Sequence, residues 1–237
     1  MGSSFPAAAY AWLAPPPGKL LAVGTKSIPF AQQLVTSDRV TLVDPDAQSL
    51  WENSDRLPSA RMIAAHPEKL PLRPQLFSAV LVSQCLQTLP QHALPSLARS
   101  LSEGGQLLVH LTVRDDTVPW VQRLAEIVRK VNPTAMTSDG GLSSLLVLDD
   151  SPHFPKLDHK TFRMWVPVTK NTLLKMVKDS DVDDAEVLDE VSELYDSLAR
   201  PAEPLRLPYT VHCWRSTVDH TRVKVDLLFE DSLRFRL

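Results

Sequence analysis

Residues 20–30 read LLAVGTKSIPF, and this stretch decides the fold. An apolar run leads into Gly24, and Ser27 with Pro29 then favours a helix start, since proline is tolerated in a first turn. A strand, a tight turn and a helix in this order indicate an α/β fold with a nucleotide-type cofactor at the turn. Such a turn usually contains several glycines, but Lys26 and Ile28 stand where further glycines are expected.

The next part of the chain alternates short apolar runs with segments of helical spacing. The pattern predicts a helix at 6–13, strands at 40–43, 62–64, 77–82 and 106–111, and helices at 94–101 and 118–131. Asp46 should cap a helix through Trp51, and Gly104-Gly105 should end helix 94–101. This alternation is typical of βαβ units. We therefore expect one parallel sheet with strand 20–23 in its centre.

The C-terminal third has a different pattern. Strands are predicted at 162–168 and 207–214, with helical spacing from Val187 to Leu198 between them, and alternation predicts a half-buried strand at 222–229. An unpaired edge is a liability, so we expect this last strand to pair with strand 207–214 or with a second copy of the chain in a homodimer. No linker or repeat divides the sequence. We expect a single domain over residues 1–237, with a core at about 11–214 and an extra segment at about 215–237.

Composition excludes several classes of function. A net charge of −3 and a pI near 6.2 give no reason to expect a nucleic-acid partner. No apolar run approaches the ~20 residues of a membrane span, and the N-terminus lacks the features of a secretory signal. Cys85 and Cys213 have no metal-ligand spacing and suit a reducing compartment. These features predict a cytoplasmic protein without a membrane span or a metal.

Several later segments carry a family pattern. They are VTLVDPD at 40–46, EKLPL at 68–72, the strand 77–84 and LARSLSEGGQLLV at 97–109. In their order and spacing, from about residue 11 to 214, they resemble the class I S-adenosylmethionine-dependent methyltransferases. The nearest group is methyltransferase type 11, which includes trans-aconitate methyltransferase-like proteins. The resemblance implies a Rossmann-like seven-stranded sheet flanked by helices, to which this chain adds a C-terminal β extension.

The resemblance also implies S-adenosylmethionine as the cofactor and a small molecule as the methyl acceptor. Asp44, at the end of the second strand, corresponds to the acid that holds the ribose hydroxyls. No catalytic residue is identified. The implied cofactor-binding residues are Val23, Gly24, Thr25, Lys26, Asp44, Pro45, Pro67, Glu68, Ser83 and Gln84.

The chain departs from the family pattern on the cofactor side. Ala22 replaces an acid, and Pro67 replaces an alanine whose N–H meets the adenine ring; proline has no N–H. Lys26 is either a solvated lysine or a partner for an anionic ligand. Two functions stay open. The protein is a methyltransferase with a remodelled turn, or it is a non-catalytic pseudoenzyme that serves as a binding or scaffolding module for a small molecule or a protein.

Some other residues have a functional and a structural interpretation. Asp179, Asp181, Asp183 and Glu190 have calcium-loop spacing, but Asp184 occupies the glycine position, so we interpret the stretch as a helix start. His110 is expected near the cleft or in the core. Asp115 and Asp116 either touch a substrate or form a turn.

Overall fold

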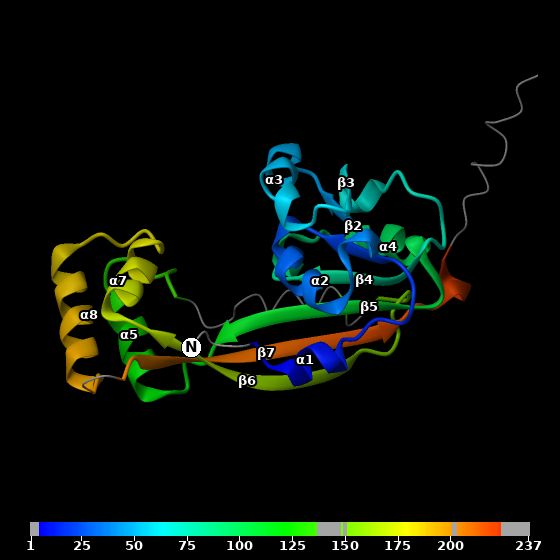
Figure 1. The fold of residues 1–237 in the computed structure, drawn as a ribbon. Coiled ribbons are helices and arrows are strands. Elements are labelled where there is room, and N and C mark those ends of the chain that lie inside the picture. The colour runs from blue at the N-terminus through cyan, green and yellow to red at the C-terminus, as the bar shows by residue number, and fades with distance from the viewer. Residues whose placement is uncertain (1–4, 137–147, 149–150, 201–202, 224–237) are drawn as a thin grey trace, which may run out of the picture. The chain divides into compact units, whose positions relative to one another are not determined.

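The computed structural model describes residues 5–136, 148, 151–200 and 203–223 (Figure 1). Its strands form a sheet in the order β3-β2-β1-β4-β5-β7-β6. The strands are β1 (Leu20–Val23), β2 (Val40–Asp44), β3 (Arg61–Ala64), β4 (Phe77–Ser83), β5 (Leu101–Arg114), β6 (Asp158–Val168) and β7 (Leu205–Thr217). The helices are α1 (Ala7–Trp12), α2 (Ile28–Leu34), α3 (Ala47–Glu52), α4 (Leu94–Ser100), α5 (Pro119–Arg129), α7 (Lys170–Lys178) and α8 (Ala185–Leu198).

The first five strands are parallel, and β1 is central among them. Leu21 lies opposite Thr41 of β2 and Val80 of β4. Strand β2 continues to β3, and β4 continues to β5, with the same direction. Strand β1 is buried along its whole length, which explains its continuous apolar sequence, because parallel strands are covered on both faces. The predicted parallel sheet and its centre are confirmed.

Strand β7 contains the strand predicted at 207–214 and runs antiparallel within the sheet. The N–H of Asp115 donates to Pro208 O beyond one end of β5, and the N–H of Val218 donates to Gly105 O near the other end. The strand predicted at 162–168 is also present, as part of β6. The fold is thus a Rossmann-like α/β sheet with one reversed strand.

Contacts within the chain gather in two compact units. Among the described residues, the sheet unit comprises 10–110, 148, 151–160 and 213–223, and the helical unit comprises 5–9, 111–136, 161–200 and 203–212. Strands β5, β6 and β7 contribute residues to both. The single domain expected over residues 1–237 stays a prediction.

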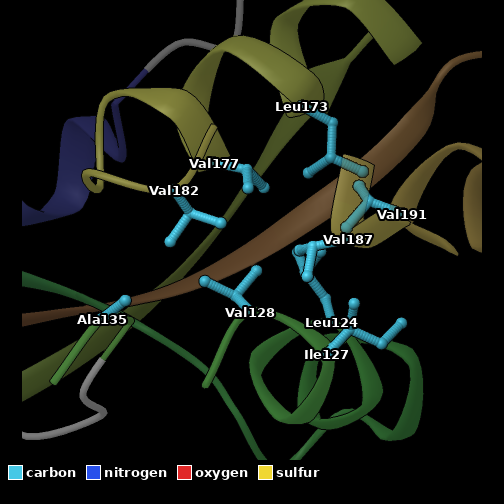
Figure 2. Close-up of a cluster of buried hydrophobic side chains, with 9 residues drawn as sticks. All are labelled: Leu124, Ile127, Val128, Ala135, Leu173, Val177, Val182, Val187 and Val191. Carbon is cyan, nitrogen blue, oxygen red and sulfur yellow. The ribbon is translucent and has the colours of Figure 1, made fainter. Parts of the chain in front are cut away.

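The helical unit has an apolar core of its own (Figure 2). Leu124 and Val128 of α5 contribute to it, with Leu173 and Val177 of α7 and Val191 of α8. On α5, which the sequence predicts as a helix at 118–131, residues 121, 124, 125 and 128 are buried. Burial of this helical stripe stabilises the unit, since each large apolar side chain removed from water contributes about 1.5–3 kcal/mol.

Two local predictions about helix ends are wrong. Helix α4 stops at Ser100, because Leu101 is fully buried and already pairs with Phe77 as the first residue of β5, so Gly104 and Gly105 lie inside a strand. Ser27 does not cap α2 with its side chain, which bonds to strand residues instead. Asp46 does cap α3, accepting from the N–H of Gln48.

The strand expected at 222–229 falls mostly outside the described residues. His220–Arg222 forms a 3-10 turn, and the description ends at Val223. Pairing of this segment with a second copy stays a prediction. Of the helices in the described part of the chain, none has the length and apolar character that a bilayer crossing requires.

Candidate cofactor site

The turn after β1 needs its glycine. Gly24 has a φ of 76°, and a Cβ there would lie 3.2 Å from Cys85 Sγ. Its N–H donates to Val43 O at 2.8 Å. Asp44 fixes the next residues, because its Oδ2 accepts from Thr25 N and its Oδ1 from Asp46 N, both at 2.9 Å. The turn is therefore held against the carboxyl end of β2, where ligands of α/β sheets bind.

A closed floor, made of Ser27, Ile28 and Cys85, lies under this turn. The Ser27 hydroxyl donates to Val23 O at 2.6 Å and accepts from Ser83 N at 3.0 Å, so it bridges β1 and β4. The Cys85 thiol donates to Val23 O at 3.1 Å, and burial raises the pKa of this thiol to about 11. The thiol is neutral at physiological pH and acts as packing rather than as a nucleophile.

A cavity of about 310 Å³ opens at the turn. This volume is at the lower end of the range for small-molecule and cofactor sites. All the cofactor-binding residues predicted from the sequence line it except Ser83 and Gln84. The structure thus brings together segments after β1, β2 and β3, as expected of a site at the carboxyl ends of parallel strands.

The cavity also has walls that the sequence did not identify as candidate ligands. They are His66, Cys85, Thr88, Leu89 and Pro90. His66 follows β3 and the others follow β4. Their position after parallel strands could have marked them as candidate ligands. The path of residues 85–90 beside the cavity, however, depends on a 3-10 turn that no sequence pattern predicts.

Glu68 has unused hydrogen-bonding capacity at this cavity. Its Oε2 is buried and has no hydrogen-bond partner among the described residues. Its Oε1 lies 3.9 Å from His66 Nδ1 and 3.8 Å from His92 Nε2, distances too long for hydrogen bonds. A buried acceptor without a donor is costly, so Glu68 has a physical reason to accept a hydrogen bond from a ligand.

Ser83 and Gln84 do not line the cavity and bond to His110 instead. The Ser83 hydroxyl lies 2.8 Å from His110 Nδ1, and the N–H of Gln84 donates to His110 O at 2.9 Å. His110 is buried and stacks on Phe30, with ring centroids 4.4 Å apart. Burial lowers the pKa of His110 to about 3, so its ring is neutral. Of its two expected places, His110 therefore occupies the core.

The remaining acidic candidates have structural partners. Asp115 accepts from the N–H of Thr117 in a turn, and Asp116 lies 2.7 Å from Arg114 Nε in an ion pair. Asp184 caps α8 by accepting from the N–H of Val187, and Glu190 lies 2.7 Å from Lys130 Nζ. Asp184 therefore sits at a helix start, where the sequence analysis placed it.

The chain is similar to known methyltransferases in sequence and in fold. Residues 21–109 match the family model described as a methyltransferase domain. An uncharacterized methyltransferase of Mycobacterium tuberculosis is 32% identical over 128 residues, which are 53% of this chain and 53% of that protein. A protein of Mycobacterium bovis gives the same values. The chain spans about half the length of the curated relatives it matches.

Solved structures show the same fold. A proposed type II methyltransferase from Anaeromyxobacter dehalogenans superposes with a TM-score of 0.66 at 19% identity, covering 92% of this chain and 98% of that one. A proposed methyltransferase from Bacillus halodurans gives 0.53 at 13% identity, covering 89% and 97%. Together with the strand order, these similarities show a methyltransferase domain match over residues 21–109, within a chain that has the Rossmann-like fold of the class I S-adenosylmethionine-dependent methyltransferases.

Proposed function

We propose that this protein is an S-adenosylmethionine-dependent methyltransferase with a small-molecule acceptor, and that its cofactor occupies the cavity at Gly24. The observation that carries this proposal is Glu68 Oε2, a buried acceptor without a partner among the described residues, in the wall of that cavity. A bound nucleoside would supply the missing donor through the amino group of its adenine. The match of residues 21–109 to a methyltransferase family supports the cofactor class.

Asp44 fits the ribose. Each of its oxygens accepts one backbone N–H, and an ionised carboxylate has about four acceptor sites, so capacity is left for two hydroxyl donors. Pro67 lines the cavity and offers contact area but no donor. The adenine would then be recognised through Glu68 rather than through a backbone N–H.

Lys26 is the one cavity residue of this turn with a permanent positive charge. Its side chain is exposed, and it stands where the family has a glycine. We propose that its ammonium pairs with the carboxylate of the methionine moiety. When bound, the cofactor supplies an electrophilic methyl group. Because methyl transfer is an in-line displacement that depends on proximity and orientation, the protein's residues need only hold the reactants in place.

The alternative is a non-catalytic protein that uses the same cavity to bind a small molecule or a protein segment. Ala22 favours it: this residue replaces the family's acid and is fully buried, so no carboxylate is available there for the amino group of methionine. The floor favours it as well, since the Ser27 hydroxyl and the Cys85 thiol both donate to Val23 O and so have no proton left for a ligand.

Calorimetric titration of the whole chain with S-adenosylmethionine and S-adenosylhomocysteine separates these functions. A dissociation constant in the low micromolar range is expected if the cavity holds the cofactor. Absence of binding at millimolar concentration overturns the methyltransferase proposal and supports the non-catalytic one.

Two variants at one position define the role of Lys26. Lys26→Gly should weaken cofactor binding about tenfold if the ammonium pairs with the carboxylate, which corresponds to about 1.4 kcal/mol. Lys26→Arg keeps the charge and is the matched control, with little change expected. Tighter binding by Lys26→Gly would instead mean that the lysine obstructs the cavity.

A further inference from the structure

A second cavity, here called the basic cavity, has a volume of about 520 Å³ and shares Glu68 with the cofactor cavity. Among the described residues, Lys69, Arg99 and Arg222 contribute positive charge to its lining, against one carboxylate, that of Glu68. They come from the 3-10 turn Pro67–Lys69, from α4 and from the 3-10 turn His220–Arg222. The fold therefore gathers charges that are far apart in the sequence.

The cations of the basic cavity lack ion-pair partners within 4 Å in the described part of the chain. Arg99 is oriented by the protein itself, since its Nη2 donates to Leu70 O and Leu72 O at 3.2 Å. Lys69 and Arg222 are exposed, and Asp219, which interacts electrostatically with Arg222, has its Oδ1 engaged by Thr221. Like charges in one hollow repel one another unless an anion joins them.

His153 supplies a second observation in the same cavity. Its Nδ1 is buried and has no hydrogen-bond partner among the described residues, although His153 lines the cavity. Burial lowers the pKa of His153, with Asp219 acting in the opposite direction, so the ring is mostly neutral at physiological pH. A neutral imidazole nitrogen can either donate to a ligand oxygen or accept from a ligand hydroxyl.

We propose that the basic cavity binds a small molecule carrying phosphate or carboxylate groups, at a site separate from the cofactor cavity. Arginine side chains suit such groups because the guanidinium presents paired donors to two oxygens. The binding site does not depend on the proposed function. Its coupling to the cofactor does rest on that function, because Glu68 lines both cavities: its charge repels an anion on one side and accepts from the nucleoside on the other.

Isothermal titration of the cofactor-free chain with inorganic pyrophosphate, inorganic phosphate and citrate tests the site. Ionic strength is held constant with sodium chloride, because screening weakens exposed charges. We expect saturable binding of one anion per chain. Stronger binding of pyrophosphate would identify a phosphate ligand, and stronger binding of citrate would identify a polycarboxylate.

Charge-matched variants locate the site. Arg222→Gln and Lys69→Gln should each weaken anion binding at least fivefold, since a charge-assisted hydrogen bond is lost. Arg61→Gln removes the same charge from an exposed position on β3, outside the basic cavity, and should leave binding unchanged. Melting temperatures of all three variants check that they are folded.

Glu68→Gln tests the coupling with effects of opposite sign. Removing the carboxylate charge should strengthen anion binding severalfold and weaken S-adenosylmethionine binding about tenfold. No saturable binding beyond that of chloride, or an equal loss in Arg61→Gln, would overturn the anion site. Failure of the cofactor to bind would overturn only the coupling, because the anion titration is performed without cofactor.

Discussion

Two parts of the cofactor cavity differ in how their polar atoms are bonded. One is the closed floor, and the other is the carboxylate wall, made of Asp44 and Glu68. In the floor, the Ser27 hydroxyl both donates to Val23 O and accepts from Ser83 N. In the wall, Glu68 Oε2 has no partner among the described residues, and each Asp44 oxygen accepts only one backbone N–H. Groups whose capacity is consumed stabilise the fold, whereas groups with capacity left can bind a ligand.

We therefore expect the floor residues to contribute to stability and the wall residues to contribute to ligand binding. Loss of a floor residue should lower the free energy of unfolding and change binding little. Loss of Glu68 should do the reverse. Asp44 belongs to both classes, because its carboxylate holds the turn and still has acceptor sites to offer.

The largest effect is expected for Asp44→Ala. The N–H groups of Thr25 and Asp46 lose their acceptor, and the free energy of unfolding should fall by about 2–4 kcal/mol, from two hydrogen bonds to a charged group. Cofactor binding should be lost in the same variant. Urea unfolding and calorimetry measure the two effects. Asp44→Asn keeps an acceptor oxygen and should lose less stability; unchanged stability in Asp44→Ala would mean that the carboxylate does not hold the turn.

Ser27→Ala should lower the free energy of unfolding by about 1–3 kcal/mol, because the buried N–H of Ser83 is left without its acceptor. If the variant binds cofactor as the wild type does, the floor is a structural element only. Thermal unfolding with and without S-adenosylmethionine checks this. A variant with unchanged stability but weakened binding would break the distinction between floor and wall.

His110 should make stability depend on pH. Its pKa is about 3 in the folded chain, against 6.5 for an unperturbed histidine, so the unfolded chain binds the extra proton first. The full stability is present above pH 6.5 and falls as the pH decreases toward 3. The loss in the free energy of unfolding is about 2 kcal/mol at pH 5. Urea unfolding at pH 7 and pH 5 should show this fall. His110→Gln should abolish that part of it, and His92→Gln, at an exposed histidine, should not.

Glu68→Gln should have the smallest effect on stability, less than about 0.5 kcal/mol, because no protein donor to Oε2 is lost. Its effect on cofactor binding should nevertheless be about tenfold. A melting temperature that falls by several degrees would show that Glu68 has a structural partner and would remove it from the list of ligands.

Much of the fold was predictable because it depends on local patterns. The apolar run at β1, the alternation of strands and helices up to α5 and the cap at Asp46 were all readable from the sequence. The end of α4 was not, because glycine at 104–105 is only a weak signal for a helix end when a buried leucine can start a strand earlier. Leu101 pairs with Phe77, a contact between residues far apart in the sequence.

The sequence by itself indicated a parallel sheet with strand 20–23 at its centre, the turn at Gly24 and most of the residues that gather around it, since these follow from the alternation of strands and helices and from the position of acids and glycine after strands. Only the tertiary structure decided which of those residues have donors or acceptors without a hydrogen-bond partner in the protein. The sequence indicated Ser83 as a cofactor ligand, but its hydroxyl lies 2.8 Å from His110 Nδ1, whereas Glu68 Oε2 has no partner among the described residues. The physical reason is that hydrogen-bond satisfaction depends on distances between distant segments, which no spacing in the sequence records.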